Sequence, residues 1–387
     1  MISLLTPWRG VAAAFALNGM LLGSWAARVP AVKEARGLGE AELGLMLLFM
    51  GLGALASFGP AGRVSDRIGA VTLTRGLALA YLAALPFLAV APGTPGLALA
   101  LFFFGITHGA MDVAMNSWGA EVERRIGRPV MSGFHAMWSL GAGAGAGLGF
   151  AATSLGAGVA LHFTLAALVG LVLLCPFLLQ PWTSARREGP GGGAPVFALP
   201  RGALVPVGMI GLASGLGEGG TADWSAIFLS AVAGAGESQA TLGYALFAAA
   251  MLAMRLCTDR LARIAGPARV ARAGALVASA GLALLLLPAP WPVALAGFAL
   301  MGLGYAPLYP LCFSRAAADP DIPPGQAIAG VATLGYGSVL MGPPLIGLIA
   351  DLLSLRAAFL LVALAALAAA LLAPSLATAA RSPGRTG

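Results

Sequence analysis

Residues 96–118 read GLALALFFFGITHGAMDVAMNSW and contain one formally charged side chain, that of Asp112. A helix of roughly 20 mostly apolar residues is long enough to cross the hydrocarbon core of a bilayer. The stretch therefore predicts a membrane-spanning helix that carries a carboxyl group deep in the lipid.

The rest of the chain has the same character. Of its 387 residues, 59% are hydrophobic and 10% are charged, whereas soluble domains carry about 25% charged residues. This composition excludes a soluble enzyme, a DNA-binding protein and a disordered chain. The three cysteines lie far apart in apolar runs and show neither metal-ligand nor disulfide spacing. We therefore expect an all-α integral membrane protein with no metal site and no cofactor.

Breaking the apolar runs at charges, prolines and glycine clusters predicts twelve spans. The expected spans are 9–29, 41–61, 72–91, 96–118, 131–153, 158–180, 203–230, 239–257, 268–288, 291–314, 326–350 and 356–379.

The basic residues predict the orientation. With the N-terminus inside, 18 of the 22 Lys and Arg residues, Arg255 among them, fall in cytoplasmic segments. Basic residues concentrate on the cytoplasmic side of membrane proteins, so both termini are expected there. The excess of basic charge then reports topology and contact with anionic lipid, and no nucleic-acid partner is expected.

A polar, glycine-rich segment divides the twelve spans into six and six. We expect an N-terminal six-helix bundle at 1–182, a cytoplasmic linker at 183–202 and a C-terminal six-helix bundle at 203–387. Two such bundles predict pseudo-symmetric repeats that face each other across a central path. The fifth span carries a run of alternating glycine and alanine, 141–147, which we expect at the contact between the bundles.

The expected loop after the second span reads GRVSDRIG, residues 62–69. Gly62 and Gly69 permit close approach or tight turning, while Asp66 and Arg67 can make charge-assisted hydrogen bonds. After the eighth span, a degenerate copy keeps only the Asp259–Arg260 pair.

This loop, in this position, resembles the signature loop of the major facilitator superfamily (MFS). The resemblance extends over the whole chain and implies a transporter that works by alternating access. It also implies that the loop latches the two bundles together while the site faces outward.

Ionisable residues inside spans are costly in lipid and are functional candidates by default. His108, Asp112 and Asn116 recur every four residues in the fourth span, so they share one helical face. Glu218 lies near the middle of the seventh span, among several glycines that we expect to let the helix bend. We expect Asp112 and Glu218 to bind protons or substrate, because protonation would remove a buried charge and permit reorientation.

Other polar side chains are candidates for the same path. Asn18 and His135 are candidate solute or proton ligands, and Trp138, Tyr305 and Tyr309 are candidate stacking partners for a planar ligand. Arg28, at the outer end of the first span, is a candidate gate residue that pairs with an acid such as Asp223 when the outside closes. Glu121 and Glu123, beside several arginines, are expected to form a solvated cytoplasmic cluster.

Two stretches resemble an uncharacterised subgroup of bacterial inner-membrane permeases that is loosely similar to the fucose permease branch. The first comprises 109–116, 127–129 and 134–139, and the second is 218–225. Asp112 and Asn116 match the spacing of an acid and an Asn in that branch, with Asp in place of Glu. Fucose permease also uses an acid in its first span, whereas the first span here carries Asn18 and no acid, so any proton coupling would follow a different scheme.

These observations favour a proton-coupled symporter or permease of the bacterial inner membrane that acts as a monomer on a small polar or sugar-like metabolite. Proton-driven efflux of lipophilic compounds is the alternative. An integral membrane enzyme is a remote third possibility, because His108 and Asp112 superficially resemble an acyltransferase pair but no activated nucleophile is recognisable.

Overall fold

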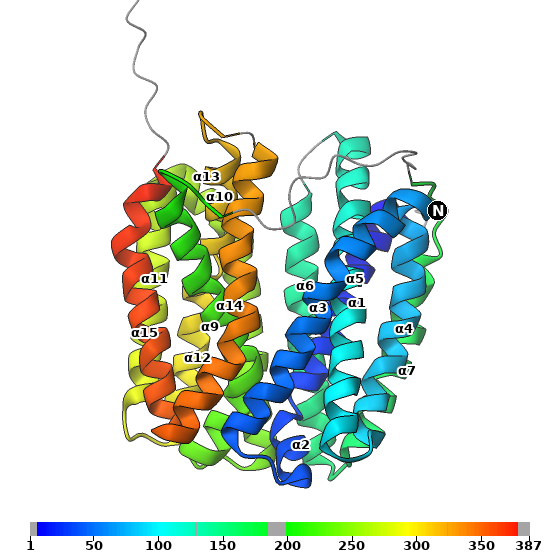
Figure 1. The fold of residues 1–387 in the computed structure, drawn as a ribbon, viewed down its shortest axis with the longest axis vertical. Helices are drawn as coiled ribbons and strands as arrows, with labels where there is room; N and C mark the ends of the chain where they lie inside the picture. Colours follow the sequence, from blue (N-terminus) through cyan, green and yellow to red (C-terminus); the bar gives the residue numbers. More distant parts are fainter. Residues whose placement is uncertain (1–5, 128–129, 185–198, 323, 378–387) are drawn as a thin grey trace, which may run out of the picture.

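The computed structural model describes residues 6–127, 130–184, 199–322 and 324–377 as a bundle of long helices (Figure 1). We call the elements from α1 to α8 the first half and those from α9 to the chain end the second half. The terminus side is the side where α1 begins and α15 ends, and the opposite side, which carries α2, is the α2 side. In Figure 1 the terminus side is at the top and the two halves stand side by side.

Among the described residues, the first half contains eight helices. They are α1 (Pro7–Ala26), α2 (Val29–Arg36), α3 (Glu40–Ile68), α4 (Ala70–Val90), α5 (Gly93–Ile126), α6 (Met131–Ser154), α7 (Val159–Leu173) and α8 (Cys175–Leu178).

In the part that the structure describes, the second half contains seven α-helices and two short elements of other helical type. They are α9 (Leu204–Ile227), η1 (Phe228–Val232), α10 (Glu237–Ala265), α11 (Pro267–Leu286), α12 (Trp291–Tyr305), α13 (Leu308–Ala317), α14 (Pro324–Leu352), α15 (Leu355–Leu372) and η2 (Ala373–Leu376).

Each of the twelve expected stretches coincides with one helix or with one broken helix. Among the described residues, eight helices are long and apolar enough to cross a membrane, or nine if the bent pair α1 and α2 is one span. The break between α12 and α13 falls at Ala306 and Pro307, as the prolines of this stretch predict.

A shift of 197 positions relates the two halves. The helices α3 and α10 each contain 29 residues, follow a glycine and begin with a glutamate. Gly69 (φ 93°, ψ 141°) separates α3 from α4, and Gly266 (φ 87°, ψ 148°) separates α10 from α11. The same shift takes Asp112 to Tyr309.

This repeat corrects two expectations about the signature segments. Residues 62–68 form the last two turns of α3, so only Gly69 is a loop residue. Asp259 and Arg260 lie inside α10, and Asp259 corresponds to Gly62 under the 197-residue shift, so the second Asp–Arg pair is not at the repeated position.

Glycines let the helices within the first half pack backbone against backbone. A methyl group at Gly19 or Gly23 of α1 would collide with a carbonyl oxygen of α6, and one at Gly141 or Gly145 of α6 would collide with α1. The expectation that this run serves the contact between the halves is therefore only partly met. Gly141 and Gly145 face α1, while Gly143 faces Ala245 and Ala248 of α10.

The predicted linker, 183–202, lies largely outside the described residues.

Candidate functional site

The carboxyl group of Asp112, on the polar stripe of α5, has no cationic partner among the described residues. Asn116 Nδ2 donates to the backbone carbonyl oxygen of Asp112 at 2.9 Å and to its Oδ1 at 3.2 Å. Both side chains are half-buried. In the described part of the chain, the carboxylate of Asp112 accepts no hydrogen bond from another helix. It lies within electrostatic range of Tyr336 on α14, in the second half.

The neighbouring His108 belongs to a network that ties four helices together. His108 Nδ1 lies 3.1 Å from the hydroxyl oxygen of Tyr81 on α4. Asn18 Nδ2 donates to the carbonyl oxygen of His108 at 3.3 Å, and Asn18 Oδ1 accepts from Trp138 Nε1 at 2.8 Å. Both ends of the fully buried Asn18 amide are thus engaged in joining α1, α5 and α6.

The second carboxyl group, that of Glu218 on α9, has a cationic partner. Arg255 Nη2 on α10 lies 3.4 Å from Glu218 Oε2, and Ser214 Oγ donates to Glu218 Oε1 at 3.0 Å. Arg255 Nη1 also donates to Ser139 Oγ on α6 at 2.8 Å. The guanidinium therefore connects Glu218 with the first half.

Arg255 is the main site residue that sequence reasoning missed. The expected topology places Arg255 among the cytoplasmic basic residues, but it lies inside α10, ten residues before the helix ends. Its side chain is 14% exposed and points between the halves. The available signal was its position within the same apolar stretch as the eighth span, because intramembrane ionisable residues mark functional sites.

The glycines around Glu218 do not break α9, since the helix is continuous from Leu204 to Ile227. They make room for tyrosines instead. A methyl group at Gly217 would collide with the ring of Tyr305, and one at Gly215 would collide with the hydroxyl oxygen of Tyr309. Both rings lie within electrostatic range of Glu218.

Two further candidates from the sequence, His135 and Asp223, lie in different surroundings. His135 is exposed, although its ring packs edge-on against Phe15 at 5.2 Å and lies within range of Arg255. Asp223 is 6% exposed and has no hydrogen-bond or ion-pair partner among the described residues. Tyr244 of α10 lies within electrostatic range of both Asp223 and Glu218.

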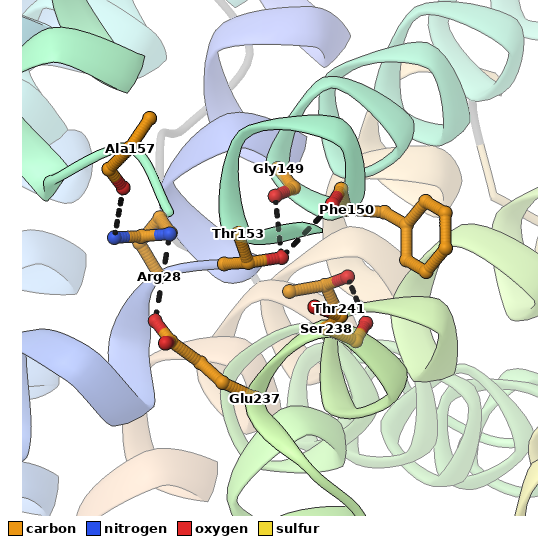
Figure 2. A network of polar contacts seen from close by, with 8 residues as sticks. All are labelled: Arg28, Gly149, Phe150, Thr153, Ala157, Glu237, Ser238 and Thr241. Carbon is orange, nitrogen blue, oxygen red and sulfur yellow. Dashed lines mark hydrogen bonds and ion pairs between the residues drawn. The ribbon is translucent and has the colours of Figure 1, made fainter. Parts of the chain in front are cut away.

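On the α2 side, an ion pair joins the halves. Arg28 Nη1 lies 3.5 Å from Glu237 Oε1, at the start of α10, and Arg28 Nη2 donates to the carbonyl oxygen of Ala157 at 3.0 Å (Figure 2). The Arg28 side chain is buried, whereas that of Glu237 is exposed. The expected pair between Arg28 and Asp223 is therefore wrong for this structure, because Glu237 is the acid in reach.

The backbones of α3 and α14 also meet on the α2 side. A methyl group at Gly44 would lie 2.8 Å from the carbonyl oxygen of Pro343, and one at Gly347 would lie 2.6 Å from that of Glu40. The two halves are thus in direct contact at this end.

At the terminus side, the charged residues of the signature segment 62–69 and of its expected copy make no contact of the kind that joins the halves on the α2 side. Asp66, Arg67, Asp259 and Arg260 are exposed, and within the described ranges they make no hydrogen bond or ion pair. The expected close helix approach at Gly62 is not made in this structure, because a methyl group there would meet nothing within 4 Å. Gly69 does approach another segment, since a methyl group there would lie 3.0 Å from Cβ of Ser184.

Two acids near this side are structural, which corrects the expectation of a solvated cluster. Glu123 Oε2 accepts from the backbone N–H groups of Val130 and Met131 at 2.7 and 2.9 Å, and so caps the start of α6. Glu121 Oε2 accepts from Trp182 Nε1 at 2.9 Å.

The described residues contain no group of three or more His, Cys, Asp or Glu side chains that could hold a metal ion. The arrangement consists of two carboxyl groups, Asp112 and Glu218, that face the region between the halves, with an ion pair closing the α2 side. Such an arrangement can bind protons and a solute, and within the described ranges it holds no nucleophile with an activating base.

Comparison with known proteins gives concordant matches along the chain. The model of the Major Facilitator Superfamily matches residues 11–321. The chain is 51% identical over 376 residues to the uncharacterized transporter y4wD of Sinorhizobium fredii, covering 97% of this chain and 100% of that protein. It is 33% identical to the membrane protein MosC of Rhizobium meliloti, covering 91% of this chain and 86% of MosC.

Solved structures share the fold at low identity. The nucleoside transporter NupG matches with a TM-score of 0.73 and 13% identity, covering 96% of this chain and 99% of NupG. A bacterial homologue of the human lysosomal transporter Spinster, in an inward-facing and unoccupied conformation, matches with a TM-score of 0.72 and 14% identity, covering 98% of this chain and 100% of the homologue.

Proposed function

Because this chain belongs to the Major Facilitator Superfamily, and is therefore a multi-pass membrane transporter and not an enzyme, we propose that it couples solute movement to protons. The proposed substrate is a small polar, sugar-like metabolite, and the proposed cycle is alternating access. The two halves rock as bundles, 1–182 and 203–387, joined by the linker 183–202.

The environment of Asp112 carries this proposal. Asp112 lies far from both ends of α5. The hydrogen-bond partner of its carboxylate is the side chain of Asn116 on the same helix. A carboxylate without a cation is costly at membrane depth. Binding a proton removes that cost, so the protonation state of Asp112 can control whether the empty transporter reorients.

Glu218 supports the coupling scheme from the second half. When Glu218 is charged, Arg255 balances it at 3.4 Å and remains bonded to Ser139 of the first half at 2.8 Å. Protonation of Glu218 frees the guanidinium from this pair. A change at Glu218 thereby alters the contact between α6 and α10.

The orientation follows from the basic residues. With Arg255 removed from the eighteen, seventeen basic residues remain in the expected cytoplasmic segments, against Arg28, Lys33, Arg36 and Arg356 outside. We therefore infer that both termini lie in the cytoplasm and that the protein belongs to the inner membrane of a bacterium.

With this orientation, we infer an inward-facing state. The Arg28–Glu237 pair and the α3–α14 contact close the outer side. The exposed Asp66 and Arg67 fit a latch that engages in the outward-facing state, as the family resemblance implies.

The polar stripe of α5 favours a polar solute. The spacing of Asp112 and Asn116 is shared with the fucose permease branch, and this likeness remains part of the proposal. Since the first span carries Asn18 and no acid, Asp112 and Glu218 would have to supply the coupling.

A second candidate function, efflux of lipophilic compounds, rests on one cavity. It measures about 290 Å³ and lies between α3, α4 and α5. Its lining consists of apolar side chains and Ser57, whose hydroxyl donates to the carbonyl oxygen of Ala54 at 2.7 Å. The lining is formed by Ala56, Ser57, Pro60, Ala61, Val64, Leu73, Ile106 and Ala110.

A ligand screen followed by transport tests the proposal. The melting temperature of the purified protein is measured in the presence of sugars, sugar acids, amino acids, nucleosides and lipophilic cations, at mildly acidic and mildly alkaline pH. A ligand at about 100 times its Kd stabilises the folded state by about 2.7 kcal/mol. Polar solutes that bind should then accumulate in proteoliposomes under an imposed proton gradient, and a protonophore should abolish the accumulation. Binding of lipophilic cations alone would favour the efflux function.

A further inference from the structure

The central polar region carries more acid than base. Three carboxyl groups, those of Asp112, Glu218 and Asp223, lie in α5 and α9. Among the described residues, the one basic side chain within electrostatic range of any of them is Arg255, which acts on Glu218. With all four groups ionised, two negative charges remain without a cationic partner.

Asp223 is the least compensated of the three. Its side chain is 6% exposed, and it has no hydrogen-bond or ion-pair partner in the described ranges. Buried charges in proteins are normally paired, because an isolated carboxylate loses its hydration. Asp223 therefore has no partner of its own, and a bound group could serve as one.

Four tyrosines lie within electrostatic range of one or more of these acids. Tyr244 lies within electrostatic range of Glu218 and Asp223, Tyr305 and Tyr309 within range of Glu218, and Tyr336 within range of Asp112. The hydroxyl group of Tyr305 is fully buried and has no hydrogen-bond partner among the described residues. The sequence keeps Gly217 and Gly215 where α9 must admit the Tyr305 and Tyr309 rings.

Carboxylates among aromatic rings match one class of ligand. An ammonium group is attracted to the carboxylate by its charge, donates hydrogen bonds to carboxylate and phenol oxygens, and is attracted to aromatic ring faces. A neutral solute supplies no positive charge to Asp223, and an anionic solute adds a like charge.

We propose that the transported solute carries a cationic amino group, and that Asp223 of α9 and Tyr244 of α10 bind this group. This inference rests on the proposed function and specifies its substrate class. Glu218 retains Arg255 as its partner, so the amine and the proton occupy different carboxyl groups.

The test uses matched pairs of compounds that differ mainly in charge. Glucosamine is paired with N-acetylglucosamine, cadaverine with 1,5-pentanediol, and choline with 3,3-dimethylbutanol. Each is titrated against the purified full-length protein by calorimetry. We expect at least one amine to bind tenfold or more tightly than its neutral partner, and Asp223→Asn to remove that preference. Asp223→Glu should restore part of the preference, and Asp351→Asn, which changes an exposed acid at the end of α14, should leave it intact.

Three results would overturn the inference: equal binding within every pair, no binding of any amine, or an unchanged preference in Asp223→Asn. If Asp223→Asn does not yield folded protein, the pairs measured on the wild type decide the matter. The proposed function is judged separately. A neutral solute that accumulates under a proton gradient would leave that function standing while the amine inference fails.

Discussion

Nη2 of Arg255 lies 3.4 Å from Oε2 of Glu218, while Nη1 of the same guanidinium donates to Ser139 of the opposite half at 2.8 Å. The side chains of Arg255 and Glu218 are 14% and 19% exposed. The pair is therefore shielded enough to matter for stability, and it is open enough to change partners during a transport cycle.

This pair should show strong energetic coupling. Arg255→Met leaves the Glu218 carboxylate without its cation, whereas the double variant with Glu218→Gln removes both charges. Breaking a fully buried pair costs about 3–5 kcal/mol. Because both side chains keep some exposure, we expect a smaller cost here, about 1–3 kcal/mol.

The measurement is a double-mutant cycle of thermal unfolding in detergent. The double variant should be more stable than Arg255→Met alone. Additive effects of the two substitutions would show that the 3.4 Å pair carries no coupling.

The packing of α1 against α6 gives a second prediction. Gly145→Ala places a methyl group against the carbonyl oxygen of Met20, while Gly147→Ala, on the same helix, meets nothing within 4 Å. Overpacking costs about 1–3 kcal/mol, so Gly145→Ala should lower the melting temperature and Gly147→Ala should not. Equal melting temperatures for the two variants would contradict the close approach of these helices.

The ion pair of the α2 side should bias the conformational equilibrium. Glu237→Gln removes the charge that faces Arg28 at 3.5 Å, and Glu237 is 57% exposed. An exposed pair contributes about 0.2–1 kcal/mol, so the open population of the α2 side should rise by up to about fivefold.

Spin labels at residues 35 and 231, in a background without the native cysteines, would report this change as a longer distance. Glu34→Gln, at an exposed residue of α2, is the matched control. A distance distribution that is identical in Glu237→Gln and the wild type would refute the gating role.

A fourth prediction concerns Gly69 and Gly266, the single residues that separate α3 from α4 and α10 from α11. Gly266 has φ 87° and ψ 148°, a region that is close to exclusive to glycine and costs other residues about 1–3 kcal/mol. Gly266→Ala should therefore destabilise the protein, and Gly69→Ala should do the same. Gly76→Ala, in the interior of α4 with no atom within 4 Å, should be neutral or slightly stabilising. Unfolding measurements that rank the three variants otherwise would contradict the repeated turn.

The membrane architecture was readable from the sequence because lipid imposes it residue by residue. Each apolar stretch had to become a helix, and Pro307 had to interrupt one. The ends of α3 and α10 were misjudged because charged residues at the membrane surface do not stop a helix. Arg67 and Arg260 continue it, and only Gly69 and Gly266 end it.

Partners between distant segments were harder to predict. The stripe on α5 follows from helical periodicity, so the sequence could group His108, Asp112 and Asn116 on one face. The pairing of Arg28 with Glu237 depends on how the halves meet, which no local pattern encodes. Arg255 was misassigned because a count of basic residues cannot distinguish a loop arginine from one that reaches 3.4 Å from Glu218.

The most direct test of the account concerns Asp112. Proteoliposomes carrying wild type or Asp112→Asn are loaded with a solute that binds the protein, and two rates are compared: accumulation driven by an imposed proton gradient, and exchange of labelled against unlabelled solute without a gradient. We predict that Asp112→Asn abolishes accumulation and retains exchange, since the neutral amide mimics the protonated carboxyl group. Equal accumulation by the variant and the wild type would remove Asp112 from the coupling mechanism.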